Sequence, residues 1–337
     1  MDFDLSDDQV ALQEGARELL DGLASPAQVR AHTTTDAAFD RALWSAMAEQ
    51  GWLGIEVDEA RGGVGLGPVE VAVLCEELGR HAAPAPFVST VLAIGALGAA
   101  GEVAWVDRLL GGDALACIAW DAAAPVPYAP SADVAVVLAD DGVYAMDVAD
   151  RPARQPAMDL TRELGWLPFD RAGARRIGDA DARDALLDRG ATFAAADLLG
   201  SGSRALDLAV EHAKDRVQFG RPIGSFQAVK HRCADMLVDV EGMRSTVYWA
   251  AWCIGAADPE AHVAASTAKT WCSDASKRVM SSALQVHGGI GFTWEHDLHF
   301  FMKRAQLDQL AFGDAVFHRA RLTSLLRPRV EAGESVV

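Results

Sequence analysis

The sequence predicts a mainly α-helical protein with a small central β region. Alanine and leucine dominate over β-branched residues in this chain of 337 residues, which favours helices. Apolar residues recur every three to four positions in both end segments, as in helices that bury one face. Short apolar runs separated by turn residues lie between these segments. We therefore predict an N-terminal helical domain at residues 1–112, a small, shortened β domain at 113–182 and a C-terminal helical domain at 183–337.

The first predicted helix begins close to the N-terminus. Ser6 is placed to cap its first turn, and Gln9 follows at the spacing of a capping box. An apolar stripe comes next, formed by Val10, Ala11, Leu12, Ala16, Leu19, Leu20 and Leu23. We expect these residues to share one face of the helix.

Two further helices are predicted on either side of a glycine-rich segment, residues 61–67. The earlier helix is expected to carry Leu43, Met47 and Trp52, and the later one to cover residues 68–79, starting with a proline. A phosphate-binding loop would need a preceding strand and a lysine after the glycines, and this segment has neither. The segment is therefore predicted to be a loop between helices.

The middle of the chain has the pattern of short strands. An apolar run covers residues 115–120 and ends in a proline-rich stretch. Two more apolar runs, at 134–138 and 143–146, flank the sequence Asp140-Asp141-Gly142. Apolar runs on both sides of Asp-Gly are a strong hairpin signal, so a β-hairpin is predicted here.

A long helix is predicted after Phe226. One apolar face recurs by threes and fours over about seven turns, and it is formed by Val229, Cys233, Met236, Leu237, Val240, Met243, Val247, Ala250 and Ile254. Long helices of this kind bury their apolar faces against one another, which predicts a helical bundle.

Charge and cysteine content limit the classes of partner. The 48 acidic and 30 basic residues give a net charge of −18, so the basic surface expected of a nucleic-acid-binding protein is absent. The same charge disfavours an anionic membrane, and an anionic ligand such as a CoA ester would need a local cluster of Arg and Lys. Five scattered cysteines without a paired motif suit a reducing cytoplasm. The N-terminus lacks the features of a signal peptide, and no apolar stretch is long enough for a membrane span. We expect a cytoplasmic protein without a metal site.

An ordered set of motifs narrows the prediction. They are the segment Arg216-Val217-Gln218-Phe219-Gly220-Arg221-Pro222-Ile223, then Phe226-Gln227 and Ala234-Asp235-Met236, then Gln285-Val286-His287-Gly288-Gly289-Ile290-Gly291-Phe292 and Met302-Lys303-Arg304-Ala305, with Gly62-Gly63-Val64-Gly65-Leu66 and Glu76-Glu77-Leu78-Gly79 earlier in the chain. Each motif alone would be weak, but together they resemble the acyl-CoA dehydrogenase family. The resemblance covers nearly the whole chain. It implies a family fold of an N-terminal helical domain, a β domain and a C-terminal four-helix bundle.

The resemblance also implies an FAD-dependent enzyme that removes a hydride and a proton from the α,β-carbons of an acyl-CoA thioester. In this family the subunits pair so that each FAD lies between two chains. Arg216, Phe219 and Gln227 match residues that reach a flavin held mainly by the neighbouring β domain. An arginine is a charge-assisted donor to pyrophosphate oxygens, which suits this role.

Four further positions complete the expected flavin-binding set. Gln285, Gly288 and Gly289 match residues that pass close to the adenosine part of the flavin, and paired glycines permit close backbone approach. Asp314 stands where the family has a threonine that contacts the flavin. The plain alternative is that Arg216 is a helix-end cation and Gly288-Gly289 a turn.

The catalytic base of the family has no counterpart. Most members carry it in a Tyr-Glu-Gly-Thr loop, and here Ala311-Phe312-Gly313-Asp314 occupies that loop, with Phe312 at the glutamate position. A minority carry the base on an earlier helix, at or near Gly190 in this chain. A thioester α-proton needs a positioned general base, and neither position holds a carboxylate. We therefore predict no catalytic residue in this chain.

The β domain departs from the family in the same direction. The family has a Thr-Glu-Pro-x-Ala-Gly-Ser-Asp segment and a Trp-Ile-Thr or Trp-Ile-Ser strand that hold the flavin ring and the thioester. This chain has Ile118-Ala119-Trp120-Asp121-Ala122-Ala123-Ala124-Pro125 near the first and nothing like the second. The missing glutamate and the missing β-domain segments both belong to the chain's own catalytic site. The residues that match contacts to a neighbouring chain's flavin are kept.

This pattern resembles the heteromeric branch of the family among actinobacterial enzymes that shorten sterol side chains. There, a longer catalytic chain pairs with a shorter chain that lacks the glutamate. The resemblance therefore implies a non-catalytic partner subunit in a heterotetramer that binds FAD and an acyl-CoA. Two alternatives stay open: a self-sufficient, homo-oligomeric dehydrogenase with a relocated base, and a flavin-free scaffold of the same fold.

Overall fold

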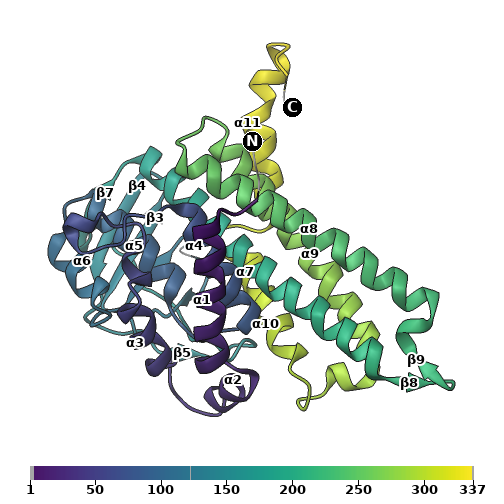
Figure 1. The fold of residues 1–337 in the computed structure, drawn as a ribbon. Coiled ribbons are helices and arrows are strands. Elements are labelled where there is room, and N and C mark those ends of the chain that lie inside the picture. Colours follow the sequence, from purple (N-terminus) through teal and green to yellow (C-terminus); the bar gives the residue numbers. More distant parts are fainter. Residues whose placement is uncertain (1–3, 122, 336–337) are drawn as a thin grey trace. The chain divides into compact units, whose positions relative to one another are not determined.

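The computed structural model describes residues 4–121 and 123–335, which are mostly helical, with a small sheet region (Figure 1). The chain divides into two compact units. The bundle unit comprises the residues up to Arg17, then Ala72–Ala82 and the chain from Ala191 onward, and the sheet unit comprises Glu18–Val71 and Ala83–Gly190. The predicted mainly helical fold with a central β region is confirmed, and the three-domain division stays a prediction.

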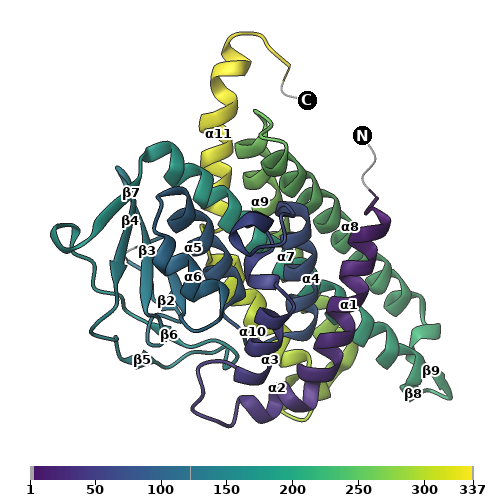
Figure 2. The ribbon, with the colours of Figure 1, turned by 60° about the vertical axis from the view of Figure 1, so that its left-hand side comes forward.

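The sheet unit joins short helices to two small sheets. Its helices are α2 (Pro26–His32), α3 (Arg41–Glu49), α5 (Phe87–Ala99) and α6 (Val103–Leu110), with 3-10 turns η1 (Trp52–Gly54), η2 (Glu59–Arg61) and η3 (Arg171–Gly173). One sheet has the order β1-β3-β4-β7 and the other β2-β6-β5. The strands are β1 (Ala116–Ala119), β2 (Val126–Pro127), β3 (Val134–Ala139), β4 (Gly142–Asp147), β5 (Arg154–Gln155), β6 (Leu164–Gly165) and β7 (Arg175–Gly178). Figure 2 shows α5 beside the strands of the larger sheet.

The predicted hairpin is confirmed. Strands β3 and β4 pair antiparallel, with Ala139 opposite Gly142, so the two-residue turn is Asp140-Asp141 and the glycine is the first residue of β4. Strand β1 runs parallel to β3 at one edge of the larger sheet, and residues 115–119 of the predicted apolar run are buried there. The sheet buries a compact apolar cluster that includes Cys117, Ala135 and Val137.

The second predicted helix is shorter than expected. Helix α3 ends at Glu49, and Gly51 adopts a left-handed backbone with φ of 75° that stops it. Trp52 therefore lies in the separate 3-10 turn η1, where its side chain is buried. The single helix predicted through Leu43, Met47 and Trp52 was wrong because the glycine was not read as a helix stop.

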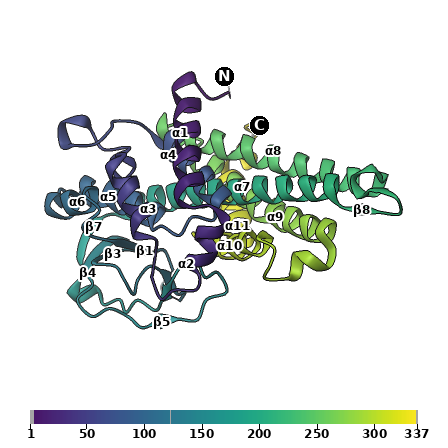
Figure 3. The same ribbon diagram turned by 60° about the horizontal axis from the view of Figure 1, so that its bottom comes forward.

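The bundle unit is built from long helices that run alongside one another (Figures 1 and 3). It holds the N-terminal part of α1 (Asp7–Leu23), most of α4 (Pro68–His81) and most of α7 (Ala180–Asp215). The remaining elements are β8 (Val217–Gln218), β9 (Arg221–Pro222), η4 (Ile223–Ser225), α8 (Gln227–Gly255), α9 (Ala261–His287), η5 (Gly288–Phe292), α10 (Leu298–Leu310) and α11 (Ala315–Glu331). The capping box of α1 is confirmed, since Gln9 donates its backbone N–H to Ser6 and accepts the backbone N–H of Ser6 in return.

The apolar face of α8 is buried over part of its length. Met236, Val240, Met243 and Val247 are buried, as predicted from their spacing. Leu237, predicted on the same face, is 50% exposed, and the turns before Met236 lie at the surface. The predicted seven-turn buried face was therefore too long, because the first turns of α8 extend beyond the helices that cover the rest.

Helices α4 and α7 meet at two glycines. A Cβ atom on Gly200 would overlap the carbonyl oxygen of Glu76, and one on Gly79 would overlap that of Asp197, so the two backbones touch directly. Arg304 of α10, 1% exposed, donates to the carbonyl oxygen of Leu78 at 3.3 Å and lies 3.9 Å from the Asp197 carboxylate. The close approach thus holds three helices of the bundle around one buried arginine.

Substitution of Gly200 by alanine should strongly destabilise the protein, because no rotamer change can move a backbone carbonyl away from the new methyl group. Overpacking a core site typically lowers the free energy of unfolding by about 1–3 kcal/mol. Because the obstacle here is backbone, we expect a loss at or above the upper end of this range. The midpoint of thermal unfolding, followed by circular dichroism, measures the loss.

A matched control is Gly15→Ala on the exposed face of α1, where no atom lies within 4 Å of the new Cβ. A glycine-to-alanine change in an open helical position should stabilise by about 0.5–1 kcal/mol. Equal stability of both variants would contradict the close helix contact.

Candidate functional site

One end of the bundle unit collects most of the predicted flavin-binding residues. Helix α7 ends at Asp215, and Arg216 follows directly, with its backbone N–H still donating to His212 at 2.9 Å. The chain then forms the β8–β9 hairpin and returns to start α8 at Gln227, as Figure 3 shows. The Arg216 side chain is exposed, and no carboxylate pairs with it in residues 4–121 or 123–335. Its guanidinium is therefore available to an external anion.

The tip of the hairpin presents an aromatic side chain. Phe219 is 90% exposed and adopts φ of 55°, an uncommon conformation for a non-glycine residue. Its ring contacts the Phe226 ring edge to face, with a centroid separation of 6.0 Å. The Arg221 guanidinium lies over the Phe226 ring, 4.2 Å from its centroid. Gln227 is exposed on the first turn of α8, 3.4 Å from His231. The hairpin is thus held in shape while the phenyl ring of Phe219 remains open to a partner.

The end of α9 supplies the remaining residues of this surface. Gln285 is exposed on the last turn, and Gly288 ends the helix with φ of 63°. Gly288 therefore needs the conformational freedom of glycine. Gly289 has no such requirement, since its φ is ordinary and no atom lies within 4 Å of an added Cβ. Nothing in the described chain explains a glycine at 289, whereas close approach of an external group would.

Three imidazole rings in contact join the end of α7 to the end of α9. The His212 ring in the last turn of α7 stacks on the His287 ring at the end of α9, with a centroid separation of 4.7 Å. The His296 ring contacts the same His287 ring edge to face, with a centroid separation of 4.3 Å. These three rings, named here the imidazole stack, place Arg216 and Gly288 at the same end of the bundle. Six of the seven predicted flavin-binding residues therefore share one surface.

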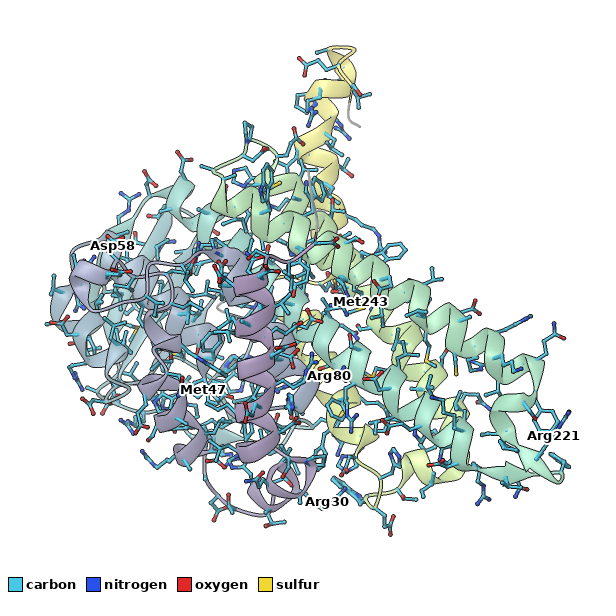
Figure 4. The ribbon with its side chains drawn as sticks, in the orientation of Figure 1. Arg30, Met47, Asp58, Arg80, Arg221 and Met243 are labelled. Carbon is cyan, nitrogen blue, oxygen red and sulfur yellow. The ribbon has the colours of Figure 1, made fainter. Side chains whose placement is uncertain are left out.

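The same end concentrates positive charge in an acidic chain. Residues 214–232 hold five Arg or Lys and one Asp, a net charge of +4, against −18 for the whole protein. Their side chains are exposed, and Figure 4 shows Arg221 at the far tip of the hairpin. This is the local cluster that an anionic cofactor or CoA ester needs. Of these basic residues, only Arg216 was predicted to bind the flavin. A count of charges along the sequence would also have found Lys214, Arg221, Lys230 and Arg232.

These features fit the adenosine and pyrophosphate part of FAD. Arg216 offers a planar, charged donor to phosphate oxygens, and Gly289 leaves open space beside the backbone. Phe219 offers an apolar face of the kind that covers an aromatic ring. This surface is open in the part of the chain that the structure describes.

The loop at the predicted base position has a strained backbone and a buried phenyl ring. Phe312 adopts φ of 55° and is 7% exposed, and Gly313 follows with φ of 96°. A Cβ on Gly313 would overlap the Phe317 ring, so glycine is required there. The loop thus keeps a tight turn that would present a side chain at 312, and the side chain present cannot accept a proton.

A hydrogen-bonded chain holds the carbonyl oxygen of Phe312. His318 is fully buried, with Nε2 at 2.9 Å from that oxygen and Nδ1 at 3.2 Å from Ser266 Oγ. Because a carbonyl only accepts, Nε2 must carry the proton, and Nδ1 accepts from Ser266. Arg321 in turn donates to Ser266 Oγ at 3.0 Å. Burial is the main cause that lowers the pKa of His318 to about 4, so the ring is neutral at neutral pH.

Behind this loop lies a buried lysine that sequence analysis missed. Lys269 of α9 is fully buried and donates to the carbonyl oxygen of Gln309 at 2.9 Å and to Ser273 at 3.3 Å. Burial lowers the pKa of its ammonium group to about 7, and the nearby Asp308 carboxylate opposes this shift. The lysine closes the last turn of α10, whose carbonyls have no helical partner. The sequence around Lys269 did not indicate that this lysine would be buried against the end of another helix.

Asp314 lies apart from the other predicted flavin-binding residues. Its carboxylate caps α11 by accepting the backbone N–H of Phe317 at 2.8 Å. The loop that carries it lies near Lys269, nineteen residues before Gly288 on α9, or about 28 Å along the helix axis. The structure thus shows a helix-capping role, and a flavin contact by Asp314 stays a prediction.

Other kinds of site are not found in the described part of the chain. Residues 4–121 and 123–335 contain no group of three or more His, Cys, Asp or Glu that could hold a metal ion. Over the same residues, no helix combines the length and apolarity that crossing a membrane requires. None of the five cysteines forms a disulfide, and four of them are buried.

Comparison with protein-family models gives two matches. Residues 6–112 match the acyl-CoA dehydrogenase N-terminal domain, and residues 180–324 match the acyl-CoA dehydrogenase C-terminal domain. The acyl-CoA dehydrogenase IpdE2 of Mycolicibacterium smegmatis is 36% identical over 305 residues, which cover 89% of this chain and 93% of that protein. The acyl-CoA dehydrogenase FadE27 of Mycobacterium tuberculosis is 30% identical, covering 96% and 98% of the two chains.

Two solved structures share this fold over nearly the whole chain. A chain of the Tcur3481-Tcur3483 steroid ACAD G363A variant superposes with a TM-score of 0.87 and 29% identity, covering 96% of this chain and 99% of the other. A chain of the ChsE4-ChsE5 complex from Mycobacterium tuberculosis superposes with a TM-score of 0.85 and 29% identity over the full length of both.

The buried His318 should make the protein less stable in acid. Its pKa is about 6.5 in the unfolded chain and about 4 in the folded one, so the unfolded state binds the proton first. Stability is full above pH 6.5 and falls as the pH drops to about 4, by on the order of 3 kcal/mol. Urea unfolding at pH 7 and pH 4.5 measures this difference.

His318→Gln removes the titrating group, so the stability difference between the two pH values should shrink. His231→Gln, at an exposed position of α8, is the control and should keep the wild-type difference. The same pH dependence in both variants would show that His318 is not the responsible group.

Proposed function

Since this chain belongs to the acyl-CoA dehydrogenase family, we propose that it is the non-catalytic partner subunit of an FAD-dependent acyl-CoA dehydrogenase. In this proposal it completes the flavin site of a longer catalytic chain in a heterotetramer. One observation carries the proposal: the surface around Arg216 and Gly289 is exposed and open, while a buried phenyl ring, Phe312, stands at the position predicted for the base.

The donated surface would bind the flavin from outside the catalytic chain. Arg216 has no carboxylate partner among the described residues, so its charge would serve the pyrophosphate of a neighbour's FAD. Gln285, Gly288 and Gly289 would contact the adenosine part through backbone and amide groups. Phe219 and Gln227 would cover the flavin and exclude water. The bound FAD supplies the hydride acceptor of the reaction.

The chain's own site lacks the other half of the chemistry. Removal of the α-proton of a thioester needs a base within hydrogen-bonding distance. The loop at 311–314 retains its turn, yet its side chain at 312 is a buried phenyl ring. The base would come from the partner chain, and the acyl-CoA would bind in the intact half-sites only.

The substrate class follows from the relatives. One solved neighbour is a steroid acyl-CoA dehydrogenase, and the second neighbour with similar identity is also a two-chain complex. We therefore propose an acyl-CoA with a bulky, steroid-derived acyl group as substrate of the assembled enzyme.

The central experiment compares the chain alone with the chain co-expressed with a longer family member that has an intact Glu-Gly-Thr loop. The chain alone should carry little FAD and should not oxidise acyl-CoA, because its own site lacks a base. The co-expressed complex should be yellow, with one flavin for each intact half-site. Substantial flavin and turnover in the lone chain would favour a self-sufficient enzyme. A colourless complex would favour a flavin-free scaffold.

Arg216→Ala should lower the FAD content of the complex. A hydrogen bond to a charged group contributes about 1.5–3 kcal/mol, equivalent to one to two decades in affinity. Helix content should change little, because the side chain lies exposed beyond the end of α7. Flavin absorbance after serial dilution and desalting measures retention.

Lys277→Ala removes an equivalent charge from an exposed position in the middle of α9 and serves as the control. It should leave flavin retention unchanged. If both variants retain flavin as the unmodified complex does, Arg216 does not contact the cofactor.

Phe312→Glu tests whether loss of the base alone silenced the chain's own site. The new carboxylate would be buried in an apolar position, where it tends to take up a proton and destabilise the fold. We expect no dehydrogenation of an acyl-CoA panel by this variant without its partner, because the β domain lacks the segments that hold a flavin ring. Robust turnover would overturn the interpretation of the β domain.

A further inference from the structure

The β8–β9 hairpin carries a phenylalanine in a backbone conformation that this residue seldom adopts. Gln218 pairs with Arg221 across the hairpin, so the two-residue turn is Phe219-Gly220. Both turn residues have a positive φ, 55° and 78°, as in type I′ hairpin turns. Such turns favour asparagine, aspartate or glycine at the first position, and a bulky side chain there is strained. Strain of this kind persists only where the surrounding structure holds it.

The base of the hairpin is held against the end of α7. Ile223 donates its backbone N–H to the carbonyl oxygen of Arg216 at 2.8 Å. A Cβ on Gly224 would come within 2.9 Å of the carbonyl oxygen of Ala213, so the chain after β9 packs closely on α7. These contacts fix where the hairpin begins, but the residues from Val217 to Pro222 are all exposed. The strained turn therefore needs support from another group.

The Phe226 ring, just before α8, provides this support. It contacts the Phe219 ring edge to face, with a centroid separation of 6.0 Å. The Arg221 guanidinium lies over the same ring, 4.2 Å from its centroid. Arg221 forms no ion pair with any residue in 4–121 or 123–335, so the favourable partner of its charge is the face of this ring. One ring thus joins the turn, the following strand and the start of α8.

We propose that Arg221 is a positioning residue of the donated flavin surface. By stacking on Phe226 it keeps the strained turn closed, with the Phe219 ring presented to the flavin of a neighbouring chain. A ring that is ordered in advance binds at a lower entropy cost, because it is not immobilised on binding. The inference rests on the proposed function and assigns Arg221 a role through Phe226, without a contact to the cofactor.

The first test follows chymotrypsin cleavage after Phe219 in the full chain without a partner. The closed turn must open before a protease can bind it, so the cleavage rate reports the opening equilibrium. A cation over a ring at an exposed site shifts such an equilibrium by about two- to fivefold, and Arg221→Ala should speed cleavage by this factor. Each rate is divided by that of a peptide with the same sequence as residues 214–226 of the variant, which removes the effect of the substitution on protease recognition.

Two further variants separate the stack from the charge. Phe226→Leu keeps an apolar side chain and removes the ring, so it should speed cleavage as Arg221→Ala does. Arg221→Lys keeps a cation on a flexible stem and should restore part of the protection. Wild-type cleavage rates in both Arg221→Ala and Phe226→Leu would overturn the proposal.

The matched control is Arg278→Ala. Arg278 is another exposed arginine over an aromatic ring, that of Trp271 on α9, at 5.5 Å from the centroid. Its removal should leave cleavage after Phe219 unchanged. Cleavage after Phe292, which is 76% exposed, serves as an internal reference in the same digest and should be equal in all variants. A general loosening of the protein would change both rates together and would overturn the specific role of Arg221.

The second test measures FAD release from the co-expressed complex by the rise in free flavin fluorescence. Arg221→Ala and Phe226→Leu should each speed release by about two- to fivefold, because FAD leaves through the opened hairpin. The double variant should release FAD no faster than either single variant, since both changes remove the same contact. Unchanged release in the single variants would overturn the positioning role. Additive acceleration in the double variant would also overturn it, because Arg221 would then act on the cofactor directly.

The two ideas can fail independently. Cleavage after Phe219 is measured without any flavin, so it tests the hairpin whether or not the chain serves a neighbour. FAD retention in the Arg216→Ala complex tests the proposed function. Fast release from Arg216→Ala with unchanged release from Arg221→Ala would support the proposed function and overturn the role of Arg221.

Discussion

The contact between the backbones of α4 and α7 is the constraint on which the bundle unit depends. Glycines at 79 and 200 let the two helices touch, and Arg304 from α10 joins them at the carbonyl of Leu78. Glu76, one turn earlier, accepts hydrogen bonds from Arg244 at 2.5 Å and Tyr248 at 2.6 Å on α8. Four helices are thus fixed within two turns of one crossing. Because a long helix is stiff, this crossing also fixes the position in space of the end of α7, which Arg216 follows directly.

The two loops that matter for function differ in how they are stabilised. The loop at 311–314 is held from behind by His318, Ser266 and Arg321, so its strained turn persists although its side chain has no catalytic group. The turn at Gly288 is supported by the contacting rings of His212, His287 and His296, and its outer face is open. A rigid turn without a base suits a subunit whose own site is silent. An open surface at the end of a helix suits one that serves a neighbour.

Periodicity, capping and turn signals predicted much of the fold because each depends on residues close in sequence. The capping box at Ser6 and the β3–β4 hairpin are of this kind. The length of the buried face on α8 was overestimated, since periodicity shows which residues align and not how far other helices extend. For the site, the motif set located six residues that the structure brings to one end. It missed the imidazole stack, because His212 and His287 meet only through tertiary structure, and the role of Lys269, which burial alone reveals.

The basic stretch at 214–232 has a consequence for how two chains would find each other. It carries a net charge of +4, so the rest of the protein carries −22, the difference between −18 and +4. Such an asymmetric distribution is an electric dipole, and dipoles orient during diffusion before any contact forms. The basic hairpin would orient toward negative charge on another chain, and the acidic remainder would orient away from it. Association of this kind is fast at low ionic strength and slows as salt screens charges beyond roughly 10 Å.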